Sequence, residues 1–252
     1  MNKIFIAVAM FAVLSTVPAL PVRAEQKIAD ELSEADRLFL YRTDHAKALA
    51  ALSRYREYYK EHPDDPEGAW RVSMACYYAG YEIYKSNSDK KILYAEGRDA
   101  GQVSLKINPE SAPACFWTAV NMALYGQTAG VIKMLFTLGT VRGLLEKSSR
   151  IDPAYAYGGA FRILGKIDQE LPGILGGSNE RAKEYYEKAI NVAPDEPMNY
   201  LFISELFQKA FADKKSALEA AEKGLSLPLP DITRHESRWG MGELKKIVSK
   251  LK

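Results

Sequence analysis

The chain of 252 residues carries 34 basic and 32 acidic side chains, and 47% of its residues are hydrophobic. A charge so nearly balanced argues against nucleic acid or an anionic membrane as a partner held by charge alone. The sequence contains none of the nucleophile, zinc-protease or phosphate-loop motifs that indicate catalysis. Its two cysteines and three histidines show no metal-binding spacing. We therefore expect a non-enzymatic protein without a cofactor or a metal.

The first 24 residues have the pattern of an export signal. Lys3 precedes an uninterrupted apolar run at residues 4–14, and residues 22–24 supply small or aliphatic side chains for a cleavage site. The apolar run is shorter than the roughly 20 residues that span a bilayer, so cleavage is favoured over a membrane anchor. No cysteine follows the run, which argues against attachment as a lipoprotein. The prediction is a soluble periplasmic protein with one domain, residues 25–252.

The mature chain repeats a helix-ending pattern. Prolines at positions 63, 109, 153, 194 and 228 close similar segments, with spacings that fall from 46 to 34 residues. A spacing of 34 residues is that of a tetratricopeptide unit, in which two antiparallel helices end at a proline. Ahead of Pro194, the positions that a second helix packs inward hold Ala182, Tyr186 and Ala189. The pattern predicts an all-α, tetratricopeptide-like solenoid of about five hairpins, with helical insertions in the early repeats and a C-terminal capping helix.

One insertion, residues 127–145, is strongly apolar. Its apolar side chains, among them Leu135 and Phe136, cover nearly every side of any helix drawn through the segment. A helix that is apolar on all sides must be buried, so an additional helix here must have other groups packed around it, which we call its cover. Three covers remain open: the solenoid core, a second subunit, or a hydrophobic ligand in a channel. Leu135 and Phe136 are the candidate interface residues.

The stretch LPGILGGS at residues 171–178 is the most irregular part of the chain. Pro172 and Gly173 are predicted to end one helix, and Gly176 and Gly177 to permit a turn with positive φ. Ser178 or the asparagine after it can cap the next helix. A structural turn is favoured here over the rim of a binding site.

First helices line the concave face of a tetratricopeptide superhelix, where a ligand would bind. Trp70 and Trp117 each open such a helix, and taking them as equivalent positions places Tyr78 and Tyr125 on the concave face. Asn121 lies in an apolar turn, where a buried amide needs hydrogen-bond partners. Asn121 and Arg162 each have two interpretations: a structural polar residue, or a group that holds the carboxylate of a ligand. An arginine would bind that carboxylate in bidentate geometry. The candidate ligand-binding residues are Tyr78, Asn121, Tyr125 and Arg162.

Cys76 and Cys115 fall on first helices of neighbouring repeats. The register set by Trp70 and Trp117 separates them by eight residues, which is about 12 Å along a helix. A disulfide tolerates only about 7 Å between Cα atoms. We therefore expect two buried free thiols, which thiol counting on the unfolded, unreduced protein would detect.

Three stretches carry a resemblance to a known family: DPAYAYGG from residue 152, LPGILGGSNERA at 171–182, and RHESRWGMGELKKIV at 234–248. They resemble the periplasmic T-component of TRAP transporters, a tetratricopeptide-repeat-associated family, over roughly residues 41–251. The resemblance implies a periplasmic protein that docks the solute-binding component of a TRAP transporter for small organic acids or apolar solutes. It also implies a homotrimer with a pore through each subunit. The chain differs from lipid-anchored members, because Glu25 stands where they need a cysteine.

A second hypothesis keeps the fold and changes the ligand. A periplasmic tetratricopeptide adaptor would hold extended peptide segments of envelope proteins in its groove. Capture of a peptide without any small molecule would favour this alternative, whereas a bound organic acid would favour the transport accessory.

Overall fold

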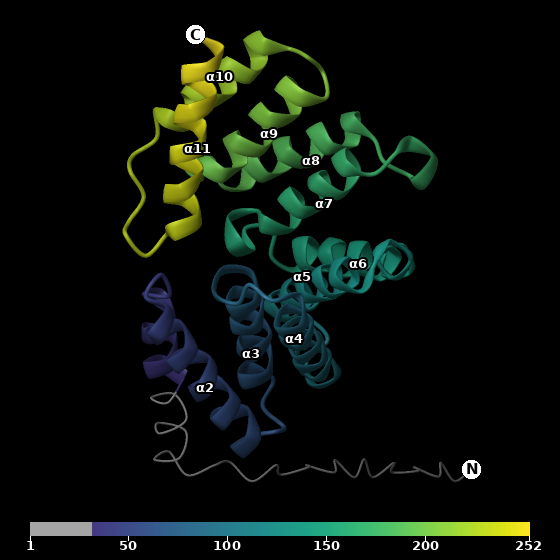
Figure 1. The fold of residues 1–252 in the computed structure, drawn as a ribbon, viewed down its shortest axis with the longest axis vertical. Coiled ribbons are helices and arrows are strands. Elements are labelled where there is room, and N and C mark those ends of the chain that lie inside the picture. Colours follow the sequence, from purple (N-terminus) through teal and green to yellow (C-terminus); the bar gives the residue numbers. More distant parts are fainter. Residues whose placement is uncertain (1–31) are drawn as a thin grey trace, which may run out of the picture.

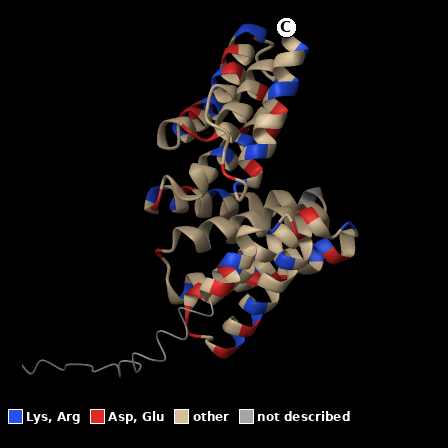
Figure 2. Ribbon diagram, turned by 90° about the vertical axis from the view of Figure 1, so that its left-hand side faces the viewer, with Lys and Arg blue, Asp and Glu red and all other residues tan. Residues whose placement is uncertain are grey.

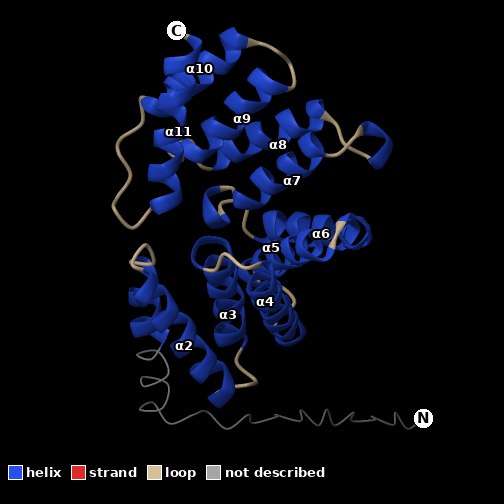
Figure 3. Cartoon of the chain, viewed as in Figure 1, coloured by secondary structure: helices blue, strands red, loops and turns tan. Residues whose placement is uncertain are grey.

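The structure is a computed structural model that describes residues 32–252, apart from the side chains of residues 131–133. The expected export signal lies outside the described residues. All regular elements in the described part are helical (Figure 3). Residues 32–40 form the first helix. The elements that follow are α2 (His45–Glu61), α3 (Pro66–Tyr78), η1 (Ala79–Ile83), α4 (Asn87–Ile107), α5 (Ala112–Ala129), α6 (Val131–Ile151), η2 (Tyr155–Tyr157), α7 (Gly159–Glu170), η3 (Gly173–Leu175), α8 (Asn179–Val192), α9 (Pro197–Lys209), α10 (Lys214–Leu225) and α11 (His235–Leu251).

Successive helices pack as hairpins and stack into a solenoid. The pairs are residues 32–40 with α2, α3 with α4, α5 with α6, α7 with α8, and α9 with α10. First helices of neighbouring hairpins also touch, as α3 does with α5, and α11 covers α9 and α10 at the C-terminal end. The predicted all-α, tetratricopeptide-like solenoid of five hairpins with a C-terminal capping helix is confirmed.

The first helices begin where the sequence provides a start signal. Proline occupies the first turn of α3, α5 and α9, where its fixed φ suits the helix and its missing N–H costs nothing. The residues before them, Asp65, Ser111 and Glu196, each accept a backbone N–H with the side chain. Local chemistry therefore sets these three helix boundaries.

Small and aromatic residues interlock between the helices of a hairpin. Tyr186 on α8 is completely buried, and so are Ala182 and Ala189 beside it. A Cβ at Gly165 on α7 would lie only 2.5 Å from the Tyr186 ring, so the glycine allows α7 and α8 to approach. This is the small–aromatic–small packing that the repeat pattern predicts.

The extra length of the early repeats extends paired helices. α4 and α6 have 21 residues and α5 has 18, whereas α8, α9 and α10 have 12 to 14. Residues 127–145 are therefore no additional helix, because they form the end of α5 and most of α6, the second helix of the third hairpin. Val141 and Leu145 lie in the core, while Phe136 is 83% exposed. One side of α6 therefore packs into the solenoid core, which was one of the three predicted covers. Another side of the helix faces outward.

In Figure 1 the start of α11 lies next to the turn that precedes α2, while the C-terminus lies at the far end of the molecule. Arg42, in the turn before α2, donates from Nη2 to Oε2 of Glu236 in the first turn of α11 at 2.5 Å. Figure 2 shows acidic and basic residues interspersed along the helices of the described part. Within residues 32–252, no helix has both the length and the hydropathy to cross a membrane.

Candidate ligand-binding surface

A continuous aromatic strip joins four elements. We define it as Tyr81 of η1, Tyr77 of α3, Trp117 and Phe116 of α5, and Tyr155 of η2. Tyr81 stacks on Tyr77 with ring centroids 5.7 Å apart, and Tyr77 lies 5.3 Å from Trp117. Phe116 contacts both Trp117 and Tyr155, at 4.8 and 5.5 Å. The Trp117 indole N–H also donates to the Tyr155 hydroxyl at 2.7 Å, which ties the strip to η2.

The backbone after Tyr155 is strained. Ala156, Tyr157 and Gly158 have φ values of 50°, 56° and 78°. The left-handed region costs a residue with a Cβ of the order of 1 kcal/mol, so two such residues in succession need support from their surroundings. Strain of this kind is concentrated at binding and catalytic sites.

Arg162 on α7 supports that strained turn. Its Nη2 donates to the carbonyl of Ala156 at 2.8 Å, and its Nη1 donates to the carbonyl of Tyr157 and to Oδ1 of Asn199, both at 2.6 Å. Arg234 covers the Tyr157 ring from the other side, with its guanidinium carbon 4.1 Å from the ring centroid. The turn is thus held between two guanidinium groups.

The charge of Arg162 has no partner of opposite sign. Within residues 32–252 the side chain makes no ion pair, and all three of its acceptors are neutral oxygens. Although part of the side chain reaches the surface, its charged end is surrounded by protein, and this burial lowers the pKa of Arg162 to about 10. The carboxylates of Glu196 and Glu236 act on it only from a distance, in the direction that raises the pKa. Arg162 is therefore a charged, desolvated group at neutral pH.

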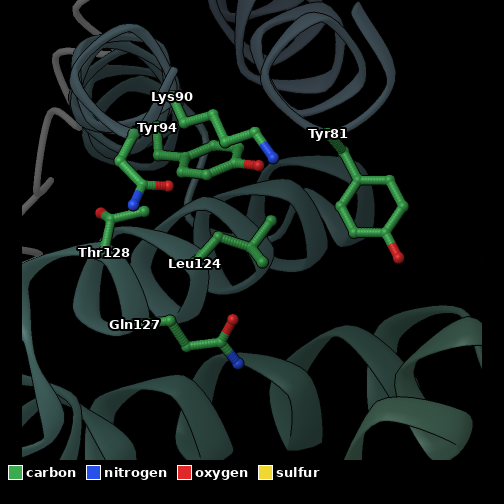
Figure 4. A pocket seen from close by; sticks show the side chains of 7 residues that line it. Tyr81, Lys90, Tyr94, Leu124, Gln127 and Thr128 are labelled. Atoms are coloured by element: carbon green, nitrogen blue, oxygen red, sulfur yellow. The ribbon is translucent and has the colours of Figure 1, made fainter. Parts of the chain in front are cut away.

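A separate cavity lies beside the end of the strip that Tyr81 forms (Figure 4). Its volume is about 300 Å³, and the side chains around it come from η1, α4 and α5. Lys90 and Tyr94 reach into it from α4 toward Tyr81, and Leu124 and Gln127 approach from α5. Asn87 and Thr128 complete the lining.

The structure separates the four predicted ligand-binding residues. Tyr78 is buried in the core, where its ring meets the edge of Phe39 at 5.8 Å and lies 5.7 Å below the Arg42 guanidinium. Its neighbour Tyr77 takes the place in the aromatic strip. Tyr125 is half-buried beneath Arg98, 4.6 Å from the ring. Of the four, Arg162 lies beside the aromatic strip with unused donors.

Asn121 is completely buried and joins two first helices. Its Nδ2 donates to the carbonyl and the hydroxyl of Ser73 on α3, at 2.8 and 3.1 Å, and to the carbonyl of Trp117. A Cβ at Gly97 would lie 2.6 Å from the amide, so the amide also fills the space above α4. Its Oδ1 has no hydrogen-bond partner among the described residues. This geometry fits the structural alternative for Asn121.

The two candidate interface residues, Leu135 and Phe136, differ in how far they are exposed. Phe136 is 83% exposed on α6, and Leu135 beside it is half-buried. A Cβ at Gly139 or Gly143 would touch no other atom within 4 Å, so this side of α6 is open. The interface remains a prediction.

The irregular stretch at residues 171–178 is a structural turn. Gly176 has a φ of 85°, and a Cβ at Gly177 would lie 1.8 Å from the carbonyl oxygen of Leu171. The Ser178 side chain caps α8 by accepting the N–H of Arg181 at 3.2 Å. The predicted positive φ is found at Gly176 but not at Gly177, where the close approach of Leu171 requires glycine instead, and Ser178 is the cap.

The two cysteines are buried and free, and they face different neighbours. Burial raises the pKa of both thiols, and the charged groups that act on them differ: Glu96 and Arg56 for Cys76, and Lys147 for Cys115. In the described part of the chain, no group of histidine, cysteine and acidic side chains has the arrangement of a metal site.

Sequence reasoning missed the cavity residues Tyr81, Lys90 and Tyr94. The signal for Tyr81 was present, because the run YYAGYEIY at residues 77–84 is unusually aromatic. Lys90 and Tyr94 are ordinary residues of an amphipathic helix, and only the packing of α4 beside η1 brings them to the cavity.

The stacked hairpins define a tetratricopeptide-type helical-repeat protein, and solved structures share this fold. TTC0263, a thermophilic TPR protein of Thermus thermophilus, has a TM-score of 0.59 at 19% identity, over 85% of this chain and 98% of that one. PilF of Pseudomonas aeruginosa has a TM-score of 0.56 at 12% identity, over 89% and 90%. MamA of Desulfovibrio magneticus RS-1 has a TM-score of 0.50 at 18% identity, over 79% and 95%. At these identities the likeness shows the fold alone.

A family model then places the chain among its sequence relatives. The chain belongs to the family described as "Regulator of microtubule dynamics protein 1-3", whose model matches residues 31–166, more than half of the sequence. A search among curated proteins found no sequence relative. The matched range contains the aromatic strip, the cavity and Arg162.

Proposed function

We propose that the protein is a non-enzymatic periplasmic binding protein that serves as an accessory of TRAP-type solute uptake. It docks a solute-binding protein and shelters a small organic acid against its concave surface. One observation carries the proposal: Arg162 is a desolvated cation without an acidic partner in the described chain, and it lies beside the aromatic strip.

Counting the donors of Arg162 identifies the binding edge. A guanidinium has five N–H donors, and the three hydrogen bonds to protein oxygens use both hydrogens of Nη1 and one of Nη2. The Nε hydrogen and one Nη2 hydrogen remain. Nε and Nη2 form one edge of the guanidinium, and a carboxylate can accept from both nitrogens of such an edge in bidentate geometry. An organic acid bound there would neutralise the buried charge while its apolar part lies along the aromatic strip.

Other observations support the same class of function. Tetratricopeptide solenoids present extended surfaces to other molecules. The export pattern and the three stretches that resemble the T-component support the periplasmic and TRAP parts of the proposal. Homotrimer formation is proposed with the open side of α6, where Phe136 is exposed, as the contact.

The test is purification of the protein from native periplasm, followed by mass spectrometry of the proteins and small molecules bound to it. A TRAP solute-binding protein and an organic acid are the expected companions. The acid should then bind the purified protein in calorimetry, and Arg162→Lys, which keeps the charge and loses the bidentate edge, should weaken binding about tenfold or more.

A matched control separates the site from a general charge effect. Arg150→Lys changes an exposed arginine on α6 and should leave affinity unchanged. Equal affinity of the wild type and Arg162→Lys would exclude Arg162 as the carboxylate site. Absence of any solute-binding protein among the companions would exclude the TRAP assignment.

The adaptor alternative is supported by the extent of the aromatic strip. The strip crosses four elements, from η1 over α3 and α5 to η2, which also suits an extended peptide. Envelope proteins recovered without a small molecule would favour this function.

A further inference from the structure

The cavity beside Tyr81 is built by a local departure from regular helix. α3 continues into η1, a π-helical turn over Ala79–Ile83, and such turns are often found at functional sites. Gly80 within η1 is required, because a Cβ there would lie 2.6 Å from the Tyr94 ring. The π-turn thus carries Tyr81 to one side of the cavity while Gly80 makes room for Tyr94.

Tyr94 places an unused donor in the cavity. The residue is only 2% exposed and its side chain lines the cavity, yet its hydroxyl makes no hydrogen bond with any described residue. Burial raises the pKa of Tyr94 to about 12, so the hydroxyl keeps its proton at neutral pH. The hydroxyl at the cavity is therefore available as a donor to a ligand.

Lys90 adds a positive charge at the same place. It lies four residues before Tyr94 on α4, so the two side chains share one side of the helix. Lys90 forms no ion pair or hydrogen bond within the described chain, and the other residues around the cavity are uncharged. The neighbouring Lys91, by contrast, lies 5.9 Å from the Tyr125 ring and does not line the cavity.

The remaining walls are flat and apolar or neutral and polar. Tyr81 is 54% exposed and stacks on Tyr77. Leu124 lies in the middle of the close-up (Figure 4), and Asn87 and Gln127 add amide groups to the lining. A cavity of about 300 Å³ is at the small end of ligand sites, so it suits a compact molecule.

We propose that this cavity binds a small aromatic carboxylate, whose carboxylate accepts hydrogen bonds from Lys90 Nζ and the Tyr94 hydroxyl and whose ring packs against Tyr81. One ammonium and one hydroxyl match a singly charged anion, whereas phosphate normally takes more donors. The site is distinct from the Arg162 edge in the proposed function, so either can fail alone.

The experiment is calorimetric titration of the mature protein with benzoate, with protein-observed NMR as a second readout. Benzoate is expected to bind, and Lys90→Met should weaken binding about tenfold or more, since a hydrogen bond to a charged group is lost. Tyr94→Phe removes only the hydroxyl and should weaken binding several-fold. Tyr81→Ala should reduce the preference for benzoate over cyclohexanecarboxylate.

The matched control is Lys91→Met, which should leave benzoate affinity unchanged because Lys91 does not line the cavity. Circular dichroism and thermal melting of each variant show that it is folded. The proposal is overturned if benzoate does not bind at millimolar concentration, or if Lys90→Met and Lys91→Met bind it equally. It is also overturned if inorganic phosphate displaces benzoate, or if cyclohexanecarboxylate binds the wild type as tightly.

Discussion

Helix α7 holds two buried charges that are treated in opposite ways. Near its C-terminal end, the carboxylate of Asp168 is fully buried and receives hydrogen bonds from Arg142 at 2.5 Å and from Arg181 at 2.9 and 3.1 Å. Six residues earlier, Arg162 has only neutral acceptors. The same helix thus carries one saturated ion cluster and one cation without an acid.

The difference separates a structural role from a binding role. Asp168 connects α6, α7 and the turn before α8, because Arg142 comes from α6 and Arg181 from α8, and the Asp168 carbonyl also accepts the N–H of Ser178. A buried charge with a full set of partners serves the fold. A buried charge without an opposite partner destabilises the fold unless a ligand supplies one, and this makes Arg162 the stronger candidate for function.

The largest expected effect tests the saturated cluster. Asp168→Ala would leave two guanidinium groups without their acceptor and should lower the free energy of unfolding by about 3 kcal/mol, the lower end for a broken buried pair because Arg181 is half exposed. Urea denaturation measures it. The matched control is Lys166→Ala, which removes the exposed pair with Glu170 on the same helix and should cost about 0.5 kcal/mol or less. Equal losses of stability in Asp168→Ala and Lys166→Ala would contradict the distinction between the buried and the exposed ion pair.

The pH dependence of stability sharpens the same test. Burial alone would raise the pKa of Asp168, but the hydrogen bonds from Arg181 and Arg142 outweigh it and hold the pKa below its usual range. The stability from this cluster is therefore complete above the unfolded carboxyl pKa of about 3.9 and is lost as the pH falls through the lower folded value. The stability difference between wild type and Asp168→Asn should be constant from pH 7 to 5 and shrink below about pH 4. A difference independent of pH would show that Asp168 is not titrating as a paired carboxylate.

The turn after Asp168 should be the next most sensitive part. Gly177→Ala places a Cβ against the Leu171 carbonyl and should cost about 2 kcal/mol, since backbone must move. Gly173→Ala in the same turn meets no atom within 4 Å and should be neutral or slightly stabilising. Thermal denaturation of the pair compares them directly. Similar melting temperatures would contradict the close approach of Leu171 and Gly177.

Arg162 should contribute less to stability than Asp168, although it makes three hydrogen bonds. Arg162→Met loses those bonds to the strained turn but also removes a desolvated charge, so the net cost should be about 1 kcal/mol. Denaturation in the same buffers measures it. A loss as large as that of Asp168→Ala would make Arg162 a structural residue and weaken the proposed function.

The smallest expected effect on stability concerns the open side of α6. Phe136→Asp changes an 83% exposed side chain and should leave the free energy of unfolding within about 0.5 kcal/mol. If the open side of α6 is a subunit contact, light scattering should show a smaller assembly for this variant. A stable variant of unchanged size would show that the exposed phenylalanine makes no such contact. In contrast to Phe136, Val141 on the same helix is buried in the core.

Much of the fold could be predicted because its signals are local. Proline with a capping side chain begins α3, α5 and α9, and the alanine–tyrosine–alanine spacing on α8 identifies its buried side. The turn at residues 171–178 could also be predicted, since glycine and proline restrict backbone directly. Residues 127–145 were harder, because an apolar segment shows that burial is needed without showing where the helix begins.

The candidate site could be predicted only in part. Arg162 stood out as a charge in apolar surroundings, but its neutral acceptors come from the turn before α7 and from α9. Tyr78 and Tyr77 are adjacent on α3 and point about 100° apart, so an error of one residue in the repeat register decides which one is assigned to the aromatic strip. Helical periodicity assigns a side of the helix with too little precision for that choice.

The sequence by itself determined that this protein is a stack of helical hairpins, and it located most of their ends, because caps, prolines and packing periodicity act within a few residues of chain. Only the tertiary structure decided which charges meet. Arg42 and Glu236 are 194 residues apart, and Arg142 reaches Asp168 across 26. Such pairs depend on the angle at which each hairpin stacks on the last, and small angles add up along a solenoid. The cavity between η1, α4 and α5 has the same origin, since it exists only where a π-turn meets two long helices.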